Sequence, residues 1–259
     1  MYIGCPAEIK NNEFRVGLTP AAARAYIEAG HRVAVQEGAG FGSGIADKEY
    51  FDAGAEIVSG AEPIWKEAEM IVKVKEPLPE EYQLMQPGQI VYTYFHLAAD
   101  GELTRACLDR KIIALAYETV QDKSGALPLL KPMSEIAGRM APLMGAYFLG
   151  RPFGGRGLLP TGVPGVLPAN VLIIGGGVVG SNAAKTASGF GSRVTVLDIN
   201  VNTLEHLGDI MPANVFTQFS NSQNLEESLK QADIVVGAVL VPGAKAPKLI
   251  SRDRLRIMK

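Results

Sequence analysis

The sequence predicts an α/β protein with two domains, each built on a mostly parallel sheet flanked by helices. Two series of apolar strand patterns alternating with helical patterns indicate this class, one before residue 130 and one after residue 170. A glycine-rich turn also joins a buried strand to a helix at residues 171–188. The chain has 259 residues, 47% of them hydrophobic and 20% charged, which suits one or two globular domains.

The first domain is expected over residues 1–130. Its first strand, Tyr2–Pro6, precedes a polar loop at Glu8–Leu18. Thr19 can cap a helix that has Pro20 at its first position and stops at Gly30. Further strands are expected at Arg32–Gln36, Glu56–Val58, Glu69–Lys75, Gln89–Tyr94 and Lys111–Tyr117. Helices are expected at Asp47–Ala53, from Pro63 onward and at Asp100–Arg110, with a glycine-rich loop at Gly38–Gly44.

The second domain is expected over residues 131–259 and opens on a long helix, Pro132–Leu149, bent at Pro142. An apolar stripe along this helix is expected to be a packing surface; it consists of Met133, Ile136, Ala137, Met140, Met144, Tyr147 and Phe148. A connection rich in Gly and Pro follows at Gly150–Pro168. Strands are then expected at Val171–Ile174, Arg193–Asp198, Asn214–Phe219 and Asp233–Val239. Helices are expected at Val178–Ser188, Val201–Leu207, Leu225–Gln231 and after a capping Ser251, with a loop at Val241–Leu249.

Four strands are fewer than the six that a doubly wound domain normally has. The second domain is therefore expected to be incomplete at its C-terminal end.

The glycine-rich turn indicates a dinucleotide site. Glycines at 175, 177 and 180 have the G-x-G-x-x-G spacing, directly after a strand and at the start of a helix. They allow a tight turn, close approach of a pyrophosphate to the backbone, and close packing of the helix on the strand. Asp198 ends the next strand, where a carboxylate can meet the ribose hydroxyls of NAD. The plainer alternative is a glycine-rich turn in an ordinary α/β domain.

Four charged or titratable residues of the first domain are candidates for chemistry. Lys75 ends one strand, His96 follows the next, and Glu118 follows a third. Because ligands of parallel sheets sit outside the carboxyl ends of the strands, these side chains can converge on one cleft, and Arg15 can join them from the first loop. Two cations suit a substrate carboxylate, and a histidine suits proton transfer near neutral pH.

Each of these residues has a plainer interpretation. Lys75 can be a solvated strand end, His96 a packed core histidine, Arg15 a surface charge and Glu118 a structural carboxylate. Spacing alone therefore predicts a nucleotide-binding protein with an unidentified second ligand.

Composition excludes several other classes of protein. A net charge of −2 gives no general attraction to nucleic acid or to an anionic membrane. The sequence has no run of 18 apolar residues and no signal-peptide pattern. Cys5 and Cys107 lack metal-ligand spacing, so no metal site is expected and both are interpreted as reduced core thiols of a cytoplasmic protein.

Six stretches together resemble the alanine dehydrogenase family closely. They are PAEIKNNEFRVGLTP at 6–20, VKVKEP at 72–77, YFHLA at 94–98, PMSEIAGRM at 132–140, GVPG at 162–165 and IGGGVVG at 174–180. The resemblance covers nearly all of the chain. It implies NAD-dependent oxidative deamination of L-alanine to pyruvate and ammonia and the reverse amination, with a substrate domain at 1–130, an NAD-binding Rossmann domain at 131–259, and a hexameric homo-oligomer.

The resemblance also assigns roles to single positions. It implies that Arg15 and Lys75 bind the substrate and that His96 is the catalytic acid–base group, with Lys75 assisting. The implied NAD contacts are Ser134, Gly175, Gly177, Val178, Val179, Gly180, Asp198, Ser220 and Leu249. The chain departs from the family at Thr203, where family members often carry a basic residue near the adenosine ribose.

Family chains also run well past residue 259, and the additional part includes a strand with an aspartate that faces the substrate. The 259-residue chain by itself is therefore expected to be a weak or inactive catalyst. Two other functions remain open at this point: the NAD-binding subunit of a proton-translocating transhydrogenase, and a chain that binds NAD or associates without turnover.

Overall fold

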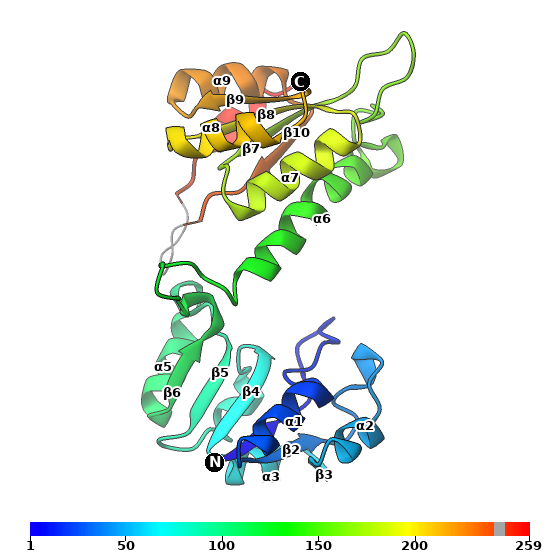
Figure 1. Cartoon of the computed structure of the whole chain (residues 1–259). Helices are drawn as coiled ribbons and strands as arrows, with labels where there is room; N and C mark the ends of the chain where they lie inside the picture. The colour runs from blue at the N-terminus through cyan, green and yellow to red at the C-terminus, as the bar shows by residue number, and fades with distance from the viewer. Residues whose placement is uncertain (241–246) are drawn as a thin grey trace. The chain divides into compact units, whose positions relative to one another are not determined.

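The computed structural model describes residues 1–240 and 247–259, and the chain divides into two compact units, Met1–Leu127 and Pro128–Lys259. Each unit is built around one parallel sheet with helices on its faces (Figure 1). The expected α/β fold class is therefore confirmed. The division between the units falls three residues before position 130.

Unit 1 has a six-stranded sheet in the order β3-β2-β1-β4-β5-β6, with all neighbours parallel. The strands are β1 (Tyr2–Cys5), β2 (Arg32–Gln36), β3 (Glu56–Val58), β4 (Met70–Lys75), β5 (Ile90–Tyr94) and β6 (Ile113–Ala116). The helices are α1 (Pro20–Glu28), α2 (Asp47–Asp52), α3 (Glu62–Glu67), α4 (Pro79–Tyr82) and α5 (Gly101–Arg110). Single 3₁₀ turns occur at Phe41–Ser43, Leu97–Ala99 and Tyr117–Thr119.

Alternation along the strands of unit 1 divides its core into two layers. On one face of the sheet, Ile3, Cys5 and Val72 pack with Ala23 of α1 and Tyr50 of α2. On the other face, side chains of β2, β4 and β5 pack against α3 and α5; this layer includes Ala34, Ile71, Val91, Trp65 and Leu103. Both faces are covered, as a parallel sheet requires.

Local signals explain most element boundaries in unit 1. The Thr19 side chain accepts a hydrogen bond from the Ala22 backbone N–H at 3.2 Å, so the predicted cap of α1 is confirmed. Strand β6 is shorter than predicted because Lys111 adopts a left-handed conformation that ends α5 first. Helix α4 was not predicted, since four residues are too few to show a helical period.

Unit 2 has a four-stranded parallel sheet in the order β10-β7-β8-β9. The strands are β7 (Asn170–Ile174), β8 (Arg193–Asp198), β9 (Val215–Phe219) and β10 (Ile234–Gly237). The helices are α6 (Lys131–Leu149), α7 (Val178–Gly189), α8 (Val201–Ile210), α9 (Ser222–Gln231) and α10 (Arg252–Arg256), with a 3₁₀ turn at Arg151–Phe153. Six residues of the expected loop Val241–Leu249, residues 241–246, lie outside the part that is described.

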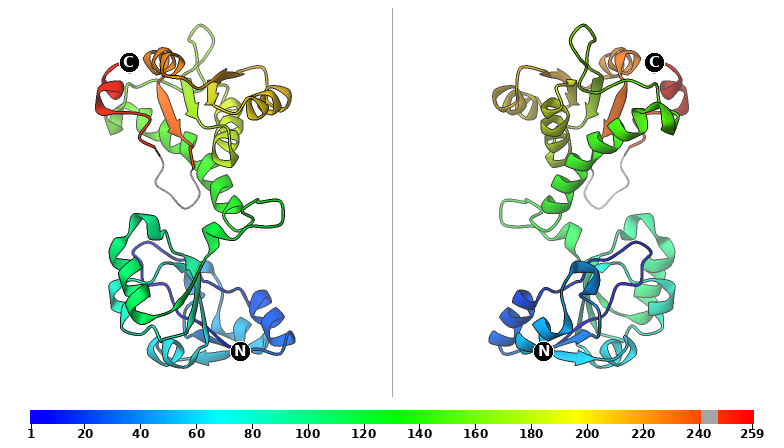
Figure 2. Two further views of the ribbon diagram at one scale, coloured as in Figure 1. Left: turned by 90° about the vertical axis from the view of Figure 1, so that its left-hand side faces the viewer. Right: turned by 90° about the vertical axis from the view of Figure 1, so that its right-hand side faces the viewer.

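Helices cover both faces of the second sheet as well (Figure 2). Side chains of α6, α7 and α8 pack on one face, and Leu225 and Leu229 of α9 pack on the other. Helix α9 begins three residues earlier than predicted because the Asn221 side chain caps it, accepting from the Asn224 backbone N–H at 2.8 Å. Within the described ranges, none of the helices is both long and apolar enough to cross a membrane.

Within unit 2, helix α6 packs through its small residues, and the large apolar stripe is left exposed. Its buried positions are the small residues Gly138 and Pro142 together with Leu149, whereas Met140 and Phe148 of the large apolar stripe are about half exposed. A Cβ atom at Gly138 would lie 2.3 Å from the Val179 carbonyl oxygen of α7. Small residues therefore allow the backbones of α6 and α7 to approach each other closely. The stripe is not used for this contact, so its role as a packing surface stays a prediction.

Candidate functional site

The carboxyl ends of β4 and β5 place two of the predicted site residues at one edge of the unit 1 sheet. Lys75 is the last residue of β4, and its register partner on β5 is Tyr94. His96 follows two residues later, after β5 has ended. The expectation that Lys75 and His96 lie at adjacent strand ends is met by this register. The sequence analysis did not name Tyr94 as a site residue. Its position at the end of a predicted strand could have indicated it, because it lies at the same sheet edge as Lys75.

Arg15 reaches the same region from the loop after β1. Its guanidinium donates from Nε to Glu13 Oε1 at 2.8 Å and from an Nη atom to Glu13 Oε2 at 2.6 Å, so the carboxylate is held by two bonds. These bonds are the main cause that lowers the pKa of Glu13 to about 2, and they raise the pKa of Arg15. The charge of Lys75 also lowers the pKa of Glu13. Both predicted substrate-binding cations therefore act on one carboxylate of the chain.

Tyr94 connects the cations to His96. Burial raises the pKa of the Tyr94 phenol, the Arg15 charge opposes that rise, and Glu118 adds to it. The Tyr94 and His96 rings have centroids 6.3 Å apart. These contacts and charges join Tyr94 to Arg15, His96 and Glu118 in one group. The sequence predicts that the last three lie in one region, and the structure adds Tyr94.

His96 has a special backbone and an accessible ring. Its φ is +55°, a left-handed conformation that histidine adopts more readily than most residues. The Glu118 carboxylate supports it by accepting from the His96 backbone N–H at 2.6 Å and the Phe95 backbone N–H at 3.3 Å. The side chain is 53% exposed, so the alternative of a packed core histidine is wrong. Glu118 therefore has a structural role, which is to hold the backbone at Phe95 and His96. This is the plainer of its two interpretations from the sequence.

A buried ionic cluster ties the loop with Arg15 to strand β4. The Lys73 side chain is 1% exposed, and its Nζ lies 2.7 Å from Glu81 Oε1 and 3.5 Å from Glu8 Oε2. The other Glu8 oxygen accepts from the backbone N–H groups of Val74 and Lys75, at 2.6 and 3.3 Å. Burial raises the pKa of Glu8, and the Lys73 charge opposes that rise. No local pattern in the sequence marks this cluster, because Glu8 lies 65 positions from Lys73.

The same loop passes very close to β4 at Gly17. A Cβ atom there would lie 2.5 Å from the Val72 carbonyl oxygen, which is closer than side-chain atoms come. Only glycine therefore fits at this crossing, and the loop is held against β4 by backbone packing as well as by Glu8.

In unit 2, the glycine-rich turn has the geometry that a dinucleotide requires. Gly175 has a φ of +100°, which favours glycine, and a Cβ atom at Gly180 would lie 1.8 Å from the Gly175 carbonyl oxygen. Gly177 instead faces open space at the N-terminus of α7. A pyrophosphate can therefore approach the backbone and the first N–H groups of this helix. The residues present fit the nucleotide that the sequence predicts.

Asp198 lies beside this turn. One carboxylate oxygen accepts from the Gly176 backbone N–H at 2.6 Å, and the other accepts from the Asn200 backbone N–H at 2.8 Å. The Ser220 backbone N–H donates to the Asp198 carbonyl oxygen at 2.9 Å, so these two predicted contacts stand together. A Cβ atom at Gly176 would lie 2.8 Å from the Thr203 methyl group, which places Thr203 at the same turn.

The other predicted nucleotide contacts have different surroundings. Val178 and Val179 begin α7, directly after the turn. Ser134 lies one turn before Gly138 on α6, and Gly138 packs on Val179, so Ser134 is on the face of α6 that meets the start of α7. Leu249 instead packs with Ile250 against the apolar layer beneath α9.

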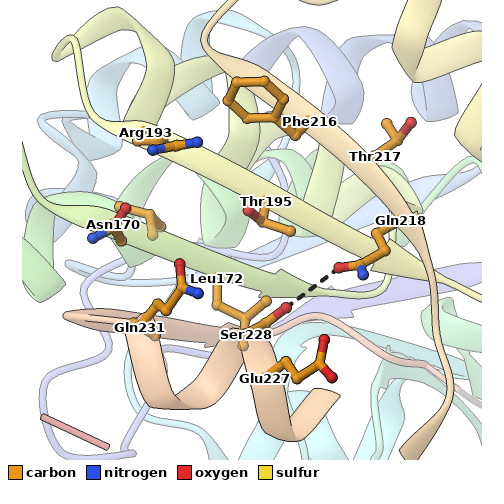
Figure 3. A pocket seen from close by; sticks show the side chains of 12 residues that line it. Asn170, Leu172, Arg193, Thr195, Phe216, Thr217, Gln218, Glu227, Ser228 and Gln231 are labelled. Carbon is orange, nitrogen blue, oxygen red and sulfur yellow. Dashed lines mark hydrogen bonds between the residues drawn. The ribbon is translucent and has the colours of Figure 1, made fainter. Parts of the chain in front are cut away.

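A cavity of about 320 Å³ opens elsewhere in unit 2, between α9 and the sheet (Figure 3). Its lining includes Asn170 and Arg193, the first residues of β7 and β8, whereas the glycine-rich turn follows the last residue of β7. Among its polar groups, the Ser228 hydroxyl lies 3.4 Å from Gln218 Oε1. The cavity is therefore distinct from the predicted nucleotide site. In residues 1–240 and 247–259, no three His, Cys, Asp or Glu side chains are grouped so that they could hold a metal ion.

A dinucleotide turn on a parallel sheet, with a second α/β unit that carries two cations and a histidine, defines a two-domain protein of the dinucleotide-binding class. Comparison with known proteins identifies the family. The family models "Alanine dehydrogenase/PNT, N-terminal domain" and "Alanine dehydrogenase/PNT, C-terminal domain" match residues 4–137 and 141–259. The chain belongs to the alanine dehydrogenase/PNT family.

Individual relatives agree with this family. The chain is 54% identical to an alanine dehydrogenase of Methanococcus maripaludis and 52% identical to one of Mycolicibacterium smegmatis, over all 259 residues and over 69% and 70% of those proteins. A solved L-alanine dehydrogenase has 50% identity and a TM-score of 0.90, covering the whole chain and 72% of that structure. A transhydrogenase from Sinorhizobium meliloti has 25% identity and a TM-score of 0.81, covering the whole chain and 75% of that structure.

The buried cluster makes a prediction about stability. Lys73→Met should lower the free energy of unfolding of unit 1 by about 3–5 kcal/mol at neutral pH, because it leaves the Glu8 and Glu81 carboxylates buried without their cation. Urea unfolding followed by fluorescence measures this, since the single tryptophan, Trp65, is buried in unit 1. Lys66→Met, at an exposed position of α3, is the control and should change stability by less than about 0.5 kcal/mol.

The loss should also depend on pH. Removing Lys73 raises further a Glu8 pKa that burial already holds above its ordinary value of 4.5. A carboxyl with a raised pKa destabilises the folded state above that raised pKa, and the penalty disappears below the ordinary value. The loss should therefore be largest at neutral pH and smaller near pH 4.5. A loss that is independent of pH would contradict this account of the cluster.

Proposed function

We propose that this chain catalyses the reversible, NAD-dependent oxidative deamination of L-alanine to pyruvate and ammonia. The observation that carries the proposal is the placement of Lys75 and His96 at the carboxyl ends of the paired strands β4 and β5, with Arg15 held by Glu13 in the loop after β1. The Lys75 charge also acts on Glu13. This arrangement suits a small substrate with a carboxylate and a carbon at which protons are exchanged. Relatives that are alanine dehydrogenases at more than 50% identity support the choice of substrate.

In this proposal, residues 1–130 bind the substrate and residues 131–259 bind the dinucleotide. The substrate carboxylate displaces Glu13 from Arg15 and takes the two-bond geometry that Glu13 displays. Lys75 adds a second positive charge, which neutralises the carboxylate and polarises the carbonyl oxygen of pyruvate. Tyr94, whose phenol feels the Arg15 charge and whose ring lies 6.3 Å from that of His96, belongs to the same region.

His96 transfers the protons. NAD, when bound, supplies the acceptor for the hydride that leaves the alanine α-carbon. In deamination, water then attacks the carbon–nitrogen double bond of the substrate, and the His96 imidazole accepts a proton from that water. In the amination direction, the same imidazole returns the proton. Its 53% exposed side chain is accessible for this exchange.

Substitution of His96 and Lys75 tests this assignment. His96→Ala should lower alanine-dependent NADH formation by about two to four orders of magnitude, because the acid–base group is lost. Lys75→Ala should lower both the rate and the affinity for pyruvate, because it removes a charge that acts on substrate and transition state. The measurement is steady-state kinetics by NADH absorbance, in the longest form of the protein that the gene encodes.

Two exposed residues serve as controls for these variants. His206→Ala in α8 and Lys66→Ala in α3 should keep normal rates. Near-normal activity of His96→Ala would contradict its role as acid–base group. NADH binding without any alanine-dependent NADH formation by the unmodified protein would favour the hydride-passing function of a transhydrogenase subunit instead.

We further propose that the cofactor is NAD rather than NADP, held by the glycine-rich turn from Gly175 to Gly180 and by Asp198. The predicted contacts at Ser134, Ser220 and Leu249 complete the site. The Asp198 carboxylate lies at the turn, where it can accept bonds from ribose hydroxyls and repel a 2′-phosphate. Thr203, at the same turn, offers no cation to a 2′-phosphate.

Two variants of Asp198 separate charge from structure. Asp198→Asn should keep an oxygen that accepts from the Gly176 backbone N–H but should lower the preference for NAD over NADP about tenfold, which corresponds to about 1.4 kcal/mol. Asp198→Ala should weaken NAD binding further, because it also releases the turn. Titration of both nucleotides by calorimetry measures these effects. Equal affinity of the unmodified protein for both nucleotides would exclude the proposal.

We also propose that the chain forms a homo-oligomer through the exposed stripe of α6. Met140, Met144, Tyr147 and Phe148 are about half exposed on one helix, and the Tyr147 ring stacks on Phe153 at 3.9 Å. An apolar surface of this kind is uncommon on a monomer. A second copy of the chain is the occupant that a helix with no charged residue between Met140 and Leu149 fits best.

Sedimentation velocity tests this association. The unmodified protein should sediment as an oligomer at micromolar concentration, and Met144→Glu should shift it toward smaller species, because a charge would be buried in the interface. Leu108→Glu places the same charge at an exposed apolar residue of α5 and should leave the oligomer intact. A stable monomer of the unmodified protein would contradict the proposal.

A further inference from the structure

Glu76 has an unusual carboxylate next to His96. It directly follows Lys75, and its side chain is only 14% exposed. One oxygen, Oε1, pairs with the ammonium of Lys10 from the loop after β1. The other oxygen, Oε2, is buried, and no group in the described ranges donates a hydrogen bond to it. This second oxygen lies 3.8 Å from Nδ1 of the His96 imidazole.

A buried carboxylate oxygen without a hydrogen-bond donor destabilises the folded protein, because it has lost its bonds to water. The cost disappears if a small rotation of the His96 ring brings Nδ1–H to hydrogen-bonding distance. The ring is 53% exposed and therefore has room to turn. Hydrogen bonds within catalytic sites are often long before substrate binds and shorten afterwards.

We propose that Glu76 is the positioning residue for His96. Its Oε2 accepts a hydrogen bond from Nδ1–H, which fixes the tautomer of the ring and leaves Nε2 as the atom that exchanges protons. The carboxylate stabilises the imidazolium that forms when Nε2 takes a proton from water. Lys10 holds the first oxygen and so fixes the direction of the second. This inference rests on the acid–base role proposed for His96.

The other groups around His96 leave this role to Glu76. The Glu118 carboxylate is engaged by the backbone N–H groups of His96 and Phe95. The Tyr94 ring lies 6.3 Å away, centroid to centroid, and burial raises the pKa of its phenol, so it remains neutral near pH 7. Lys10 acts on the histidine only across Glu76, with which it pairs.

Kinetics of four variants test the proposal. Glu76→Gln should lower kcat/KM for alanine at least about tenfold, whereas removing a fully buried orienting carboxylate in a protease triad costs roughly 10⁴-fold. The acidic limb of the pH profile should move to lower pH, because a neutral amide stabilises the imidazolium less. Glu76→Asp should restore part of the rate, and Lys10→Met should give a smaller loss than Glu76→Gln. Glu80→Gln, at an exposed carboxylate of α4, is the matched control and should change neither rate nor profile.

A second measurement reads the ring directly and needs no turnover. The nitrogen chemical shifts of ¹⁵N-labelled histidine distinguish the two neutral tautomers, and the chain has only three histidines to assign. His96 should be in the Nδ1–H form in the unmodified protein. In Glu76→Gln, it should move toward the Nε2–H form that free histidine favours, while His31 and His206 keep their shifts.

The outcomes separate this inference from the proposed function. If His96→Ala abolishes turnover while Glu76→Gln keeps the normal rate, pH profile and tautomer, the role of Glu76 is wrong and the function stands. If His96→Ala keeps the normal rate, both the function of His96 and this inference fail. A Glu76→Gln variant that loses activity with an unmoved pH profile and an unchanged tautomer has a structural role only, which also overturns the proposal.

Discussion

The candidate substrate site depends on one buried ionic cluster, Lys73 with Glu8 and Glu81. A lysine whose side chain is 1% exposed requires anions close by, and the chain supplies one from the loop after β1 and one from α4. The Glu8 carboxylate also accepts from the backbone N–H groups of Val74 and Lys75. The loop that carries Lys10, Glu13 and Arg15 is therefore anchored to the strand that ends at Lys75, directly before Glu76. Side chains distant in sequence thus keep a defined arrangement.

Around this anchor, the loop residues Arg15 and Lys10 each have a carboxylate partner. The Glu13 carboxylate is held by Arg15 and feels the charge of Lys75, and the Glu76 carboxylate pairs with Lys10. A substrate carboxylate near Arg15 would meet the same two-bond geometry that Glu13 already shows. The strained backbone of His96 is held by Glu118. Neighbouring carboxylates therefore fix the positions of the Arg15 and Lys10 cations, whose long side chains would otherwise be flexible.

Unit 2 follows a different constraint, which is close backbone packing. Gly180 allows α7 to lie against the turn after β7, and Gly138 allows α6 to lie against α7. The consequence for α6 is that its small residues are buried, and its large apolar residues are left on the outside. The contact of Gly138 with α7 therefore has two results: it packs the two helices closely, and it leaves the apolar stripe of α6 on the outside.

The sequence by itself determined the fold class, nearly all strands, and the motif residues of both candidate sites. Period-2 and helical patterns mark the elements, and the spacing of Gly175, Gly177 and Gly180 marks the turn. Lys75 and His96 could also be predicted as site residues from the sequence, because residues at the carboxyl ends of parallel strands meet at one edge of the sheet. These features are local, so they can be seen in a short window of the chain.

Only the tertiary structure decided the partners of those residues. Glu8 and Lys73 are 65 positions apart, and their contact depends on how the first loop crosses β4. The buried oxygen of Glu76 beside His96 depends on the register of β4 with β5 and on the left-handed turn after β5. The stripe of α6 marks its apolar positions, but only the fold shows that Gly138, outside the stripe, is the residue that meets α7. The partners of a charged side chain and the buried face of a helix are set by contacts between segments distant in sequence. A pattern within a short window of the chain does not contain that information.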